Sequence, residues 1–410
     1  MSILIVTQTY HPTANGQGAF TVHLAEGLAL AGFEVHVLAP SAKGRAAQVW
    51  RNGVRLHEVT SLSLKPLADN VHVPFLSSRQ VEAVIEEVQP QIVHIQDHYP
   101  LCRHAVDLAR KRDLPILGTN HFLPGNILPY IPLLSSFETG RRFLSAYMWK
   151  MVMVVYNRLD LVVAPTHSAA EILRQNGLDA PLQAISNGVQ LNRFKPCPSN
   201  HREEILRRYG LDPERDIFLY VGRVDRDKDL DTLVEAAGLL GSVPVQVGIA
   251  GRGNCEAHLE KRLQDSALDG RVVLCGFIPN RDLPDLYRSV DAFVMPSLVE
   301  LQSIASLEAM ASGLPVLAAC AGALPEIVRP GKNGYLFAPH DAQSLASKMR
   351  ELVGHPEQRK ALRQESLKMA RLHDFQNTLM AYQGVYRKLN PSIELHVGKE
   401  TLETDCLGCW

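Results

Sequence analysis

The chain has 410 residues, more than one hydrophobic core usually organises, and 46% of them are hydrophobic, which is enough for two domains of average size. Its 42 Lys and Arg residues are balanced by 43 Asp and Glu residues, which argues against a nucleic-acid-binding protein with a strongly basic surface. No apolar run reaches the roughly 18 residues of a membrane-spanning helix, and no basic segment precedes the first apolar run, so we expect a cytoplasmic protein.

The first half of the chain alternates short apolar runs with amphipathic stretches. Strands are predicted at residues 3–6, 34–38, 92–95, 116–118, 161–164 and 182–185. Helices are predicted at residues 19–31, 77–88 and 168–176. This alternation is typical of a parallel sheet with helices on both faces.

A second alternating series follows a linker that is predicted at residues 194–200 from its two prolines and its polar residues. Its predicted strands are residues 217–221, 245–250, 272–274, 292–295 and 316–318. Helices are predicted to begin near Leu230, Asn254, Asp282, Ile304 and Ala342, and a last helix spans residues 375–389. The sequence therefore predicts two doubly wound α/β domains in tandem, with a ligand at the carboxyl ends of their strands.

Seven scattered cysteines, most of them in apolar runs, are typical of reduced thiols rather than of a disulfide framework. Cys406 and Cys409 form one C-x-x-C pair without a second pair, so we favour no metal or redox role for them. Residues 391–410 show no periodicity, and we expect a flexible tail there.

Two carboxylates, Glu300 and Glu308, flank the start of the predicted helix over residues 304–312. Ser303 is the expected N-cap of this helix, and Gly313 follows its last residue. The N–H groups of a first helical turn attract phosphate, and carboxylates accept hydrogen bonds from hydroxyl groups. A ligand with both groups, such as a nucleotide sugar, fits this junction, although solvated helix charges give the same pattern.

This segment resembles the E-x7-E motif of the retaining family-4 glycosyltransferases of GT-B fold, which continues as E-A-M-A-x-G-x-P-V and reads EAMASGLPV here over residues 308–316. The resemblance covers about residues 1–390 and implies two Rossmann-like doubly wound parallel-sheet domains that face a central cleft. It assigns residues 1–195 to an acceptor-binding domain and residues 196–373 to a nucleotide-sugar domain. Residues 374–390 are then a helix that crosses back to the N-terminal domain.

The resemblance also implies how the donor is held. Arg223 and Lys228, in the loop after the strand at 217–221, match the family's cations that bind the diphosphate; pairing with the neighbouring aspartates on the surface is the alternative. Two fixed cations neutralise the leaving diphosphate, so neither a metal ion nor another cofactor is expected. The remaining donor-binding residues that the resemblance implies are Gly16, Gly18, Gly251, Phe277, Ile278, Glu300, Gln302, Ser303, Ile304 and Glu308.

The family's T-x-H segment corresponds to Thr119-Asn120-His121, which implies that His121 contacts the donor sugar; a structural histidine is the alternative. His121, Arg223, Lys228 and Glu300 are therefore the predicted catalytic residues. In the family's usual mechanism the leaving phosphate takes the acceptor's proton, so we assign no nucleophile. Glu300 is expected to bind hydroxyls of the donor sugar and Glu308 those of the ribose.

Two features indicate the acceptor. Leu301-Gln302-Ser303 stands where many members have Phe-Gly, and a Glu-x-Gln variant occurs among diacylglycerol glycosyltransferases. Residues 141–156 interleave aromatic and apolar side chains with Arg141, Arg142 and Lys150, as a helix at a membrane interface does, although a packed core helix is an equal alternative.

We therefore expect an enzyme that transfers a hexose from a nucleoside diphosphate sugar to a hydroxyl of a membrane lipid such as diacylglycerol. Uracil is the base that the family implies, and guanine and adenine are the alternatives. It would bind peripherally at the inner face of the cell membrane and would not bind nucleic acid. A soluble sugar, polyol or other small acceptor is the first alternative. A non-catalytic nucleotide-sugar-binding protein is the second.

Overall fold

Short apolar segments form the strands of two parallel sheets in the computed structural model, which describes residues 1–10, 16–63, 72–75, 78–128, 137–197, 201–266, 268 and 270–391. The larger sheet has eight strands in the order β10-β9-β8-β7-β1-β2-β4-β3. Its strands are β1 (Ser2–Val6), β2 (Glu34–Pro40), β3 (Ala47–Arg51), β4 (Val54–Val59), β7 (Ile92–Ile95), β8 (Ile116–Thr119), β9 (Leu161–Ala164) and β10 (Leu182–Ala184). β1 pairs in parallel with β2 and β7, whereas β3 is antiparallel to β4. β5 (Ser61–Ser63) and β6 (His72–Pro74) pair as a separate antiparallel sheet.

The second sheet has six strands, all paired in parallel, in the order β13-β12-β11-β14-β15-β16. They are β11 (Asp216–Val221), β12 (Val245–Ala250), β13 (Val272–Gly276), β14 (Ala292–Met295), β15 (Val316–Ala319) and β16 (Gly334–Phe337). β11 and β14 are neighbours, and the chain winds away from them in opposite directions. In doubly wound sheets such a switch point opens a crevice at the carboxyl ends of the strands, where ligands bind.

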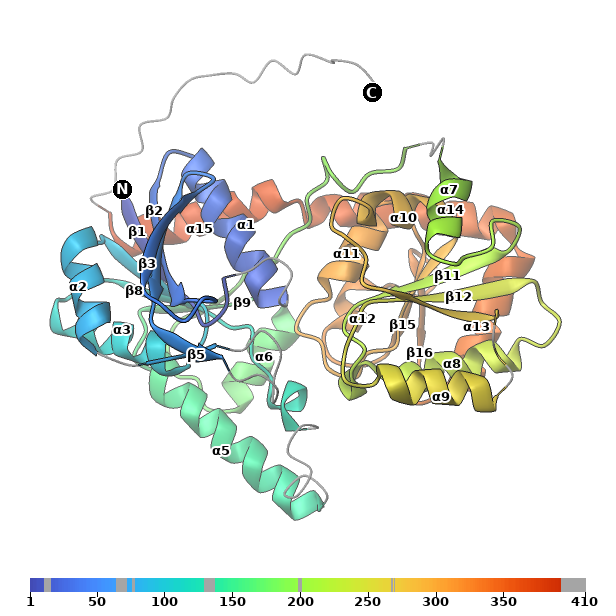
Figure 1. Cartoon of the computed structure of the whole chain (residues 1–410), viewed down its shortest axis with the longest axis horizontal. Coiled ribbons are helices and arrows are strands. Elements are labelled where there is room, and N and C mark those ends of the chain that lie inside the picture. Colours follow the sequence, from blue (N-terminus) through green and yellow to red (C-terminus); the bar gives the residue numbers. More distant parts are fainter. Residues whose placement is uncertain are drawn as a thin grey trace, which may run out of the picture. The chain divides into compact units, whose positions relative to one another are not determined.

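Helices cover both faces of the second sheet: α8, α9 and α13 lie on one side, and α7, α10, α11 and α14 lie on the other (Figure 1). The helices before the linker are α1 (Gly16–Leu30), α2 (Ser78–Val88), α3 (Pro100–Lys111), α5 (Glu138–Tyr156) and α6 (His167–Gln175). Those after it are α7 (Arg202–Arg208), α8 (Leu230–Leu239), α9 (Glu256–Asp265), α10 (Leu283–Ser289), α11 (Ile304–Ala311), α12 (Leu324–Ile327), α13 (Ala342–Gly354), α14 (Pro356–Leu372) and α15 (Phe375–Leu389). The predicted α/β fold class with two parallel sheets is confirmed.

By their contacts the residues divide into two units. Unit 1 comprises Met1–Ile95, Pro100–Ile116 and the chain from Gly384 on, and unit 2 comprises Gln96–Tyr99 and Leu117–Gln383. The whole second sheet therefore belongs to unit 2. The domain boundaries predicted at residues 195 and 373 stay a prediction.

The last helix, α15, is tied to strands of the first sheet by two buried tyrosines. Within unit 1, the Tyr386 hydroxyl lies 2.9 Å from His94 Nδ1 at β7. Within unit 2, the Tyr382 hydroxyl lies 2.9 Å from Thr119 Oγ1 at β8. The helix predicted at residues 375–389 is therefore present and is anchored at its middle and in its C-terminal part.

One predicted boundary is wrong at the start of the chain. α1 begins at Gly16 rather than at Ala19, so Gly16 and Gly18 lie in its first turn and not in the loop before it. Glycine is a poor helix former, which is why the apolar pattern alone placed the start later.

The expectations for the cysteines and for the C-terminal tail concern residues that lie partly outside the described part of the chain. Cys406 and Cys409, and all but the first residue of the predicted tail, fall outside the described residues. None of the five cysteines within the described residues forms a disulfide bond. No helix in the described ranges is both long enough and apolar enough to cross a bilayer.

Gly188, in the segment after β10, packs closely against the start of α15. It has φ of +75°, and an added Cβ would lie 2.6 Å from Thr378 Oγ1 and 2.8 Å from Phe375 Cα. We expect Gly188→Ala to lower the free energy of unfolding by about 2 kcal/mol, because both the backbone strain and the clash oppose it. Gly384→Ala is the matched control in α15, where a Cβ meets open space and helix propensity improves. Equal thermal stability of the two variants would contradict this assignment.

Candidate active site

The switch point of the second sheet brings together two loops from distant parts of the sequence. The loop after β11 carries Arg223 and Lys228, and the loop after β14 carries Ser297 and Glu300. Because β11 and β14 are neighbouring parallel strands, both loops leave the same edge of the sheet. The predicted cations and the first predicted glutamate are therefore brought together by topology.

A buried cluster of charges joins these loops. Lys228 Nζ lies 2.8 Å from Glu300 Oε1 and 3.1 Å from Asp227 Oδ2. Arg223 Nη2 lies 3.2 Å from the same Asp227 oxygen, and Arg223 also pairs with Asp225. The Asp227 side chain is 1% exposed and that of Lys228 is 11% exposed, whereas that of Arg223 is 40% exposed. One buried carboxylate thus holds both cations, and Arg223 alone reaches solvent to a substantial extent.

The protonation state of Lys228 is set by its neighbours. Burial opposes the charged form, but the negative charges of Glu300 and Asp227 outweigh this and raise the pKa of Lys228 above its ordinary value. Its ammonium group therefore stays charged at neutral pH. Ser297 Oγ, 3.3 Å from Nζ, is a further partner.

Three glycines allow the loops around the cluster to pack backbone against backbone. An added Cβ would lie 1.7 Å from the Gly222 carbonyl oxygen at Gly251, and 2.3 Å from that of Val224 at Gly253. At Gly322, with φ of +54°, it would lie 2.6 Å from the Glu300 carbonyl oxygen. Any larger residue would force these loops apart. Gly251, predicted to contact the donor, is placed directly against the Arg223 loop.

The second predicted glutamate belongs to a separate pair. Ser303 caps α11, and its side chain accepts a hydrogen bond from Ser306 N at 3.2 Å, so the predicted N-cap is confirmed. Glu308 Oε2 lies 3.1 Å from the hydroxyl of Tyr287, a fully buried residue of α10. Burial of its carboxyl group raises the pKa of Glu308 to about 7, against the opposing effects of Tyr287 and Arg193. Glu308 therefore changes charge near neutral pH.

His121, which follows β8, has a different environment. Its Nε2 lies 3.0 Å from Gln96 Oε1, and burial lowers the pKa of His121 to about 3. The imidazole is neutral at physiological pH, so it can make hydrogen bonds but cannot supply a proton as a general acid.

The other predicted residues are distributed around these groups. Phe277, after β13, is 51% exposed, while its neighbour Ile278 is 4% exposed. Ile304 is the first residue of α11. Gln302 is hydrogen-bonded within the chain to Ser186 and Asn187. Gly16 and Gly18 belong to unit 1, whereas the rest of the predicted site belongs to unit 2.

The sequence analysis did not assign three residues of this region to the site. Asp225 and Asp227 looked like surface partners of the cations, but both are buried. Tyr220, also buried, donates a hydrogen bond from its hydroxyl to the Arg223 carbonyl oxygen at 2.7 Å. The only available signal was that Asp227 immediately precedes Lys228; their burial follows from tertiary packing.

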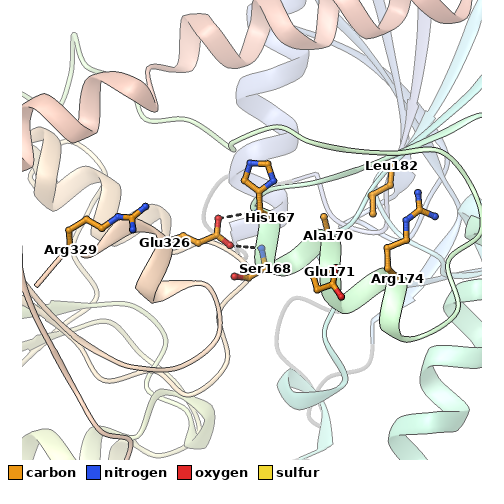
Figure 2. Close-up of a pocket in the computed structure, with 8 residues that line it drawn as sticks. All are labelled: His167, Ser168, Ala170, Glu171, Arg174, Leu182, Glu326 and Arg329. Carbon is orange, nitrogen blue, oxygen red and sulfur yellow. Dashed lines mark hydrogen bonds between the residues drawn. The ribbon is translucent and has the colours of Figure 1, made fainter.

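A cavity of about 650 Å³ lies elsewhere in unit 2, between α6 and α12 (Figure 2). It is lined by His167, Ser168, Ala170, Glu171, Arg174, Leu182, Glu326 and Arg329. The Glu326 carboxylate accepts hydrogen bonds from the backbone N–H groups of His167, at 3.1 Å, and of Ser168. The N-terminus of α6 is therefore already capped from within the chain, and the cavity contains none of the predicted site residues.

Two family models match the sequence. The model described as "Glycosyltransferase Family 4" matches residues 14–193, and the model described as "Glycosyl transferases group 1" matches residues 201–369. The two matches together span most of the chain and meet at the linker.

Curated relatives are similar over much of the chain. A sulfoquinovosyl transferase from Arabidopsis thaliana is 28% identical over 74% of this chain, which spans 58% of that protein's own length. A D-inositol 3-phosphate glycosyltransferase from Pseudarthrobacter chlorophenolicus is 28% identical over 84% of this chain and 83% of its own length.

Solved structures show the same fold. The sucrose-phosphate synthase of Thermosynechococcus elongatus superimposes with a TM-score of 0.79 at 20% identity, covering 96% of this chain and all (100%) of that one. The Anabaena protein HepE, in complex with UDP-glucose, superimposes with a TM-score of 0.74 at 18% identity, covering 96% and 100% of the two chains.

The raised pKa of Glu308 predicts a pH-dependent stability. Because the folded state holds this proton more tightly than the unfolded state, ionisation penalises folding fully above about pH 7, and the penalty disappears as the pH falls toward the ordinary value of 4.5. Glu308→Gln keeps an acceptor for Tyr287 and removes the penalty. We expect its melting temperature to exceed that of the wild type at about pH 8, with the difference shrinking at about pH 5. A difference that is independent of pH would show that Glu308 is not protonated in this way.

Proposed function

Because this chain belongs to the family-4 glycosyltransferases of GT-B fold, we propose that it transfers a hexose, with retention of anomeric configuration, from a nucleoside diphosphate sugar to a hydroxyl of a membrane lipid such as diacylglycerol. The observation that carries this proposal is the buried cluster of Arg223, Asp227, Lys228 and Glu300 at the switch point of the second sheet. It offers two cations to a diphosphate and one carboxylate to sugar hydroxyls.

The diphosphate of the donor is proposed to bind Arg223 and Lys228. Arg223 is the mobile partner, since its exposed guanidinium can leave Asp225 for a phosphate while Asp227 keeps Lys228 in place. The two cations stabilise negative charge on the departing diphosphate, so no metal ion is needed in this scheme. Uracil is the proposed base because HepE was solved with UDP-glucose, and Phe277 and Ile278 are proposed to border it.

The remaining predicted residues complete the donor site. Glu300 is proposed to accept hydrogen bonds from hexose hydroxyls, and Glu308, in its ionised form, those of the ribose. The neutral His121 is proposed to contact the hexose. Gly16 and Gly18 are proposed to contact the donor through the backbone of α1. Gly251, which follows β12, and Ser303 and Ile304, at the start of α11, are proposed to contact it through their own backbone.

The chemistry proposed is attack on the same face as the departing group. The acceptor oxygen bonds to the anomeric carbon as the bond from that carbon to the phosphate oxygen breaks, and this phosphate oxygen takes the acceptor's proton. Arg223 and Lys228 contribute most when charge develops on the phosphate, that is, in the transition state.

Helix α5 supports the lipid acceptor. Phe143, Tyr147 and Val154 are 73%, 53% and 49% exposed, and their spacing places them on one face of the helix. Arg141, Arg142 and Lys150 are exposed on the same helix, and Lys150 lies on the same face as these apolar residues. Trp149 is buried and holds the C-terminal part of the helix on the protein. Exposed aromatic rings flanked by cations suit the surface of an anionic membrane, where the rings enter the headgroup layer.

A soluble acceptor is the second candidate. The relative from Pseudarthrobacter chlorophenolicus is named for D-inositol 3-phosphate, a small soluble acceptor, and it is aligned over most of its length. The two candidates differ in whether transfer requires a lipid surface.

The donor site is tested by Glu300→Ala and Lys228→Ala. With UDP-hexose and an acceptor, each is expected to lower kcat by about a hundredfold or more, because each removes a group that meets the transition state. Release of the nucleoside diphosphate measures turnover, and circular dichroism verifies folding. Glu351→Ala is the matched control, since it breaks the Lys348–Glu351 pair on α13, 2.9 Å long, outside the site.

Near wild-type rates in folded Glu300→Ala and Lys228→Ala would overturn the site. If Lys228→Ala does not fold, Lys228→Arg keeps the charge and is expected to fold with a lowered rate, since the longer side chain displaces Glu300.

The membrane surface is tested by the double variant Phe143→Asp/Tyr147→Asp with vesicles of anionic phospholipid and diacylglycerol. We expect vesicle binding to fall about tenfold or more, because two exposed rings lose their burial in the bilayer interface. The control is Leu372→Asp, an equally exposed apolar residue (74%) on α14. Undiminished vesicle binding of the double variant would refute the membrane surface on α5, and full wild-type activity on a soluble sugar without lipid would refute the lipid acceptor.

A further inference from the structure

The loop that carries Glu300 is fixed at each of its positions. The Glu300 carbonyl oxygen accepts a hydrogen bond from Ala323 N at 3.0 Å, and the Leu301 carbonyl oxygen accepts one from Thr166 Oγ1 at 2.8 Å. Ser303 is occupied as the N-cap of α11. Gln302 lies in sequence between Leu301 and Ser303, and its side chain is 7% exposed.

Both polar atoms of the Gln302 amide are engaged within the chain. Oε1 accepts a hydrogen bond from Asn187 N at 2.7 Å and lies 3.3 Å from Ser186 Oγ. Nε2 lies 3.1 Å from the same hydroxyl. A buried amide with both ends satisfied stabilises one arrangement of its loop, since breaking it strands a donor and an acceptor.

The anchor of Gln302 is itself rigid. Ser186 Oγ lies 2.9 Å from His373 Nδ1, and the Ser186 carbonyl oxygen accepts a hydrogen bond from Thr378 Oγ1 at 2.8 Å. Val189 N donates to the His373 carbonyl oxygen at 2.7 Å, beside the parallel bridge between Val189 and Asp374. Gln302 therefore binds the place where the segment after β10 and the segment before α15 are joined.

We propose that Gln302 is a positioning residue, which anchors the Glu300 loop to Ser186 and Asn187 so that the Glu300 carboxylate stays beside Lys228. This replaces the direct donor contact predicted for Gln302 from the sequence. Its consequence for catalysis rests on the proposed function, whereas the anchoring itself does not. A shift of the loop by about 1 Å separates Glu300 from Lys228 and from the sugar hydroxyls, which is enough to lower the rate strongly.

The experiment compares three variants of the full chain. Gln302→Leu keeps the volume and removes every hydrogen bond, whereas Gln302→Glu keeps an acceptor for Asn187 N and Ser186 Oγ. Gln246→Leu is the matched control: Gln246 is 4% exposed, accepts from Asp212 N at 2.7 Å and donates to the Gly270 carbonyl oxygen at 2.8 Å, far from Glu300 in sequence and on β12. Two readouts are taken, site-resolved hydrogen exchange of the Asn187 amide without substrate, and kcat and KM with UDP-hexose.

In Gln302→Leu we expect faster exchange at Asn187 and a kcat lowered about 10- to 100-fold, as the loss of a buried hydrogen-bonded anchor implies. Gln302→Glu is expected to restore both readouts to within a few-fold of the wild type, and Gln246→Leu to leave both unchanged. Unchanged exchange at Asn187 in Gln302→Leu overturns the anchor. A Gln302→Glu variant that protects Asn187 but is as slow as Gln302→Leu overturns the positioning role and assigns Gln302 Nε2 to the ligand. If the wild type transfers from no donor, the proposed function fails, while the exchange comparison still decides the anchor.

Discussion

The contact between Lys228 and Glu300 is the interaction on which the rest of the site depends. A lone ammonium group in a place this buried would lose its proton or leave the site, and a lone carboxylate would take one up. Lys228 is kept charged by Glu300 and Asp227, so the folded protein holds its ammonium group in place before any ligand arrives. Their meeting requires β11 and β14 to be neighbours, which ties the chemistry of the site to the strand order of the sheet.

The same arrangement gives the two cations different environments. Lys228 is buried and bound on two sides, while Arg223 is held by aspartates on one side and faces solvent on the other. The cluster contains two cations and three carboxylates, Asp225, Asp227 and Glu300, so it does not carry a surplus of positive charge. Under the proposed function, an incoming diphosphate therefore gains little from net charge and much from geometry, because Asp225 and Asp227 already hold Arg223 in place.

Local signals decided what the sequence could predict. β7, β9, β12 and β14 were predicted to the residue because buried parallel strands read as mainly apolar runs. α11 was predicted to within one residue, at its C-terminal end, because Ser303 and Gly313 are strong cap residues. β3 was not predicted because all five of its residues are exposed and give no buried apolar run. The Asn52-Gly53 turn, which is typical of a hairpin, was the available sign of its pairing with β4. The partners of Gln302 lie 115 and 116 positions away in sequence, and the burial of Asp227 arises from packing. Neither the partners of Gln302 nor the burial of Asp227 produces a pattern in the nearby sequence.

The glycine contacts around the cluster have a consequence for how this protein can diversify. At Gly251, Gly253 and Gly322 no side chain fits, since each backbone touches the backbone of a neighbouring loop. A side chain at any of these positions would displace a neighbouring backbone, so the loops around Arg223 and Glu300 can keep their path only with glycine there. Under the proposed function, a change of donor sugar or base is therefore accommodated by residues whose side chains have room, such as the exposed Phe277.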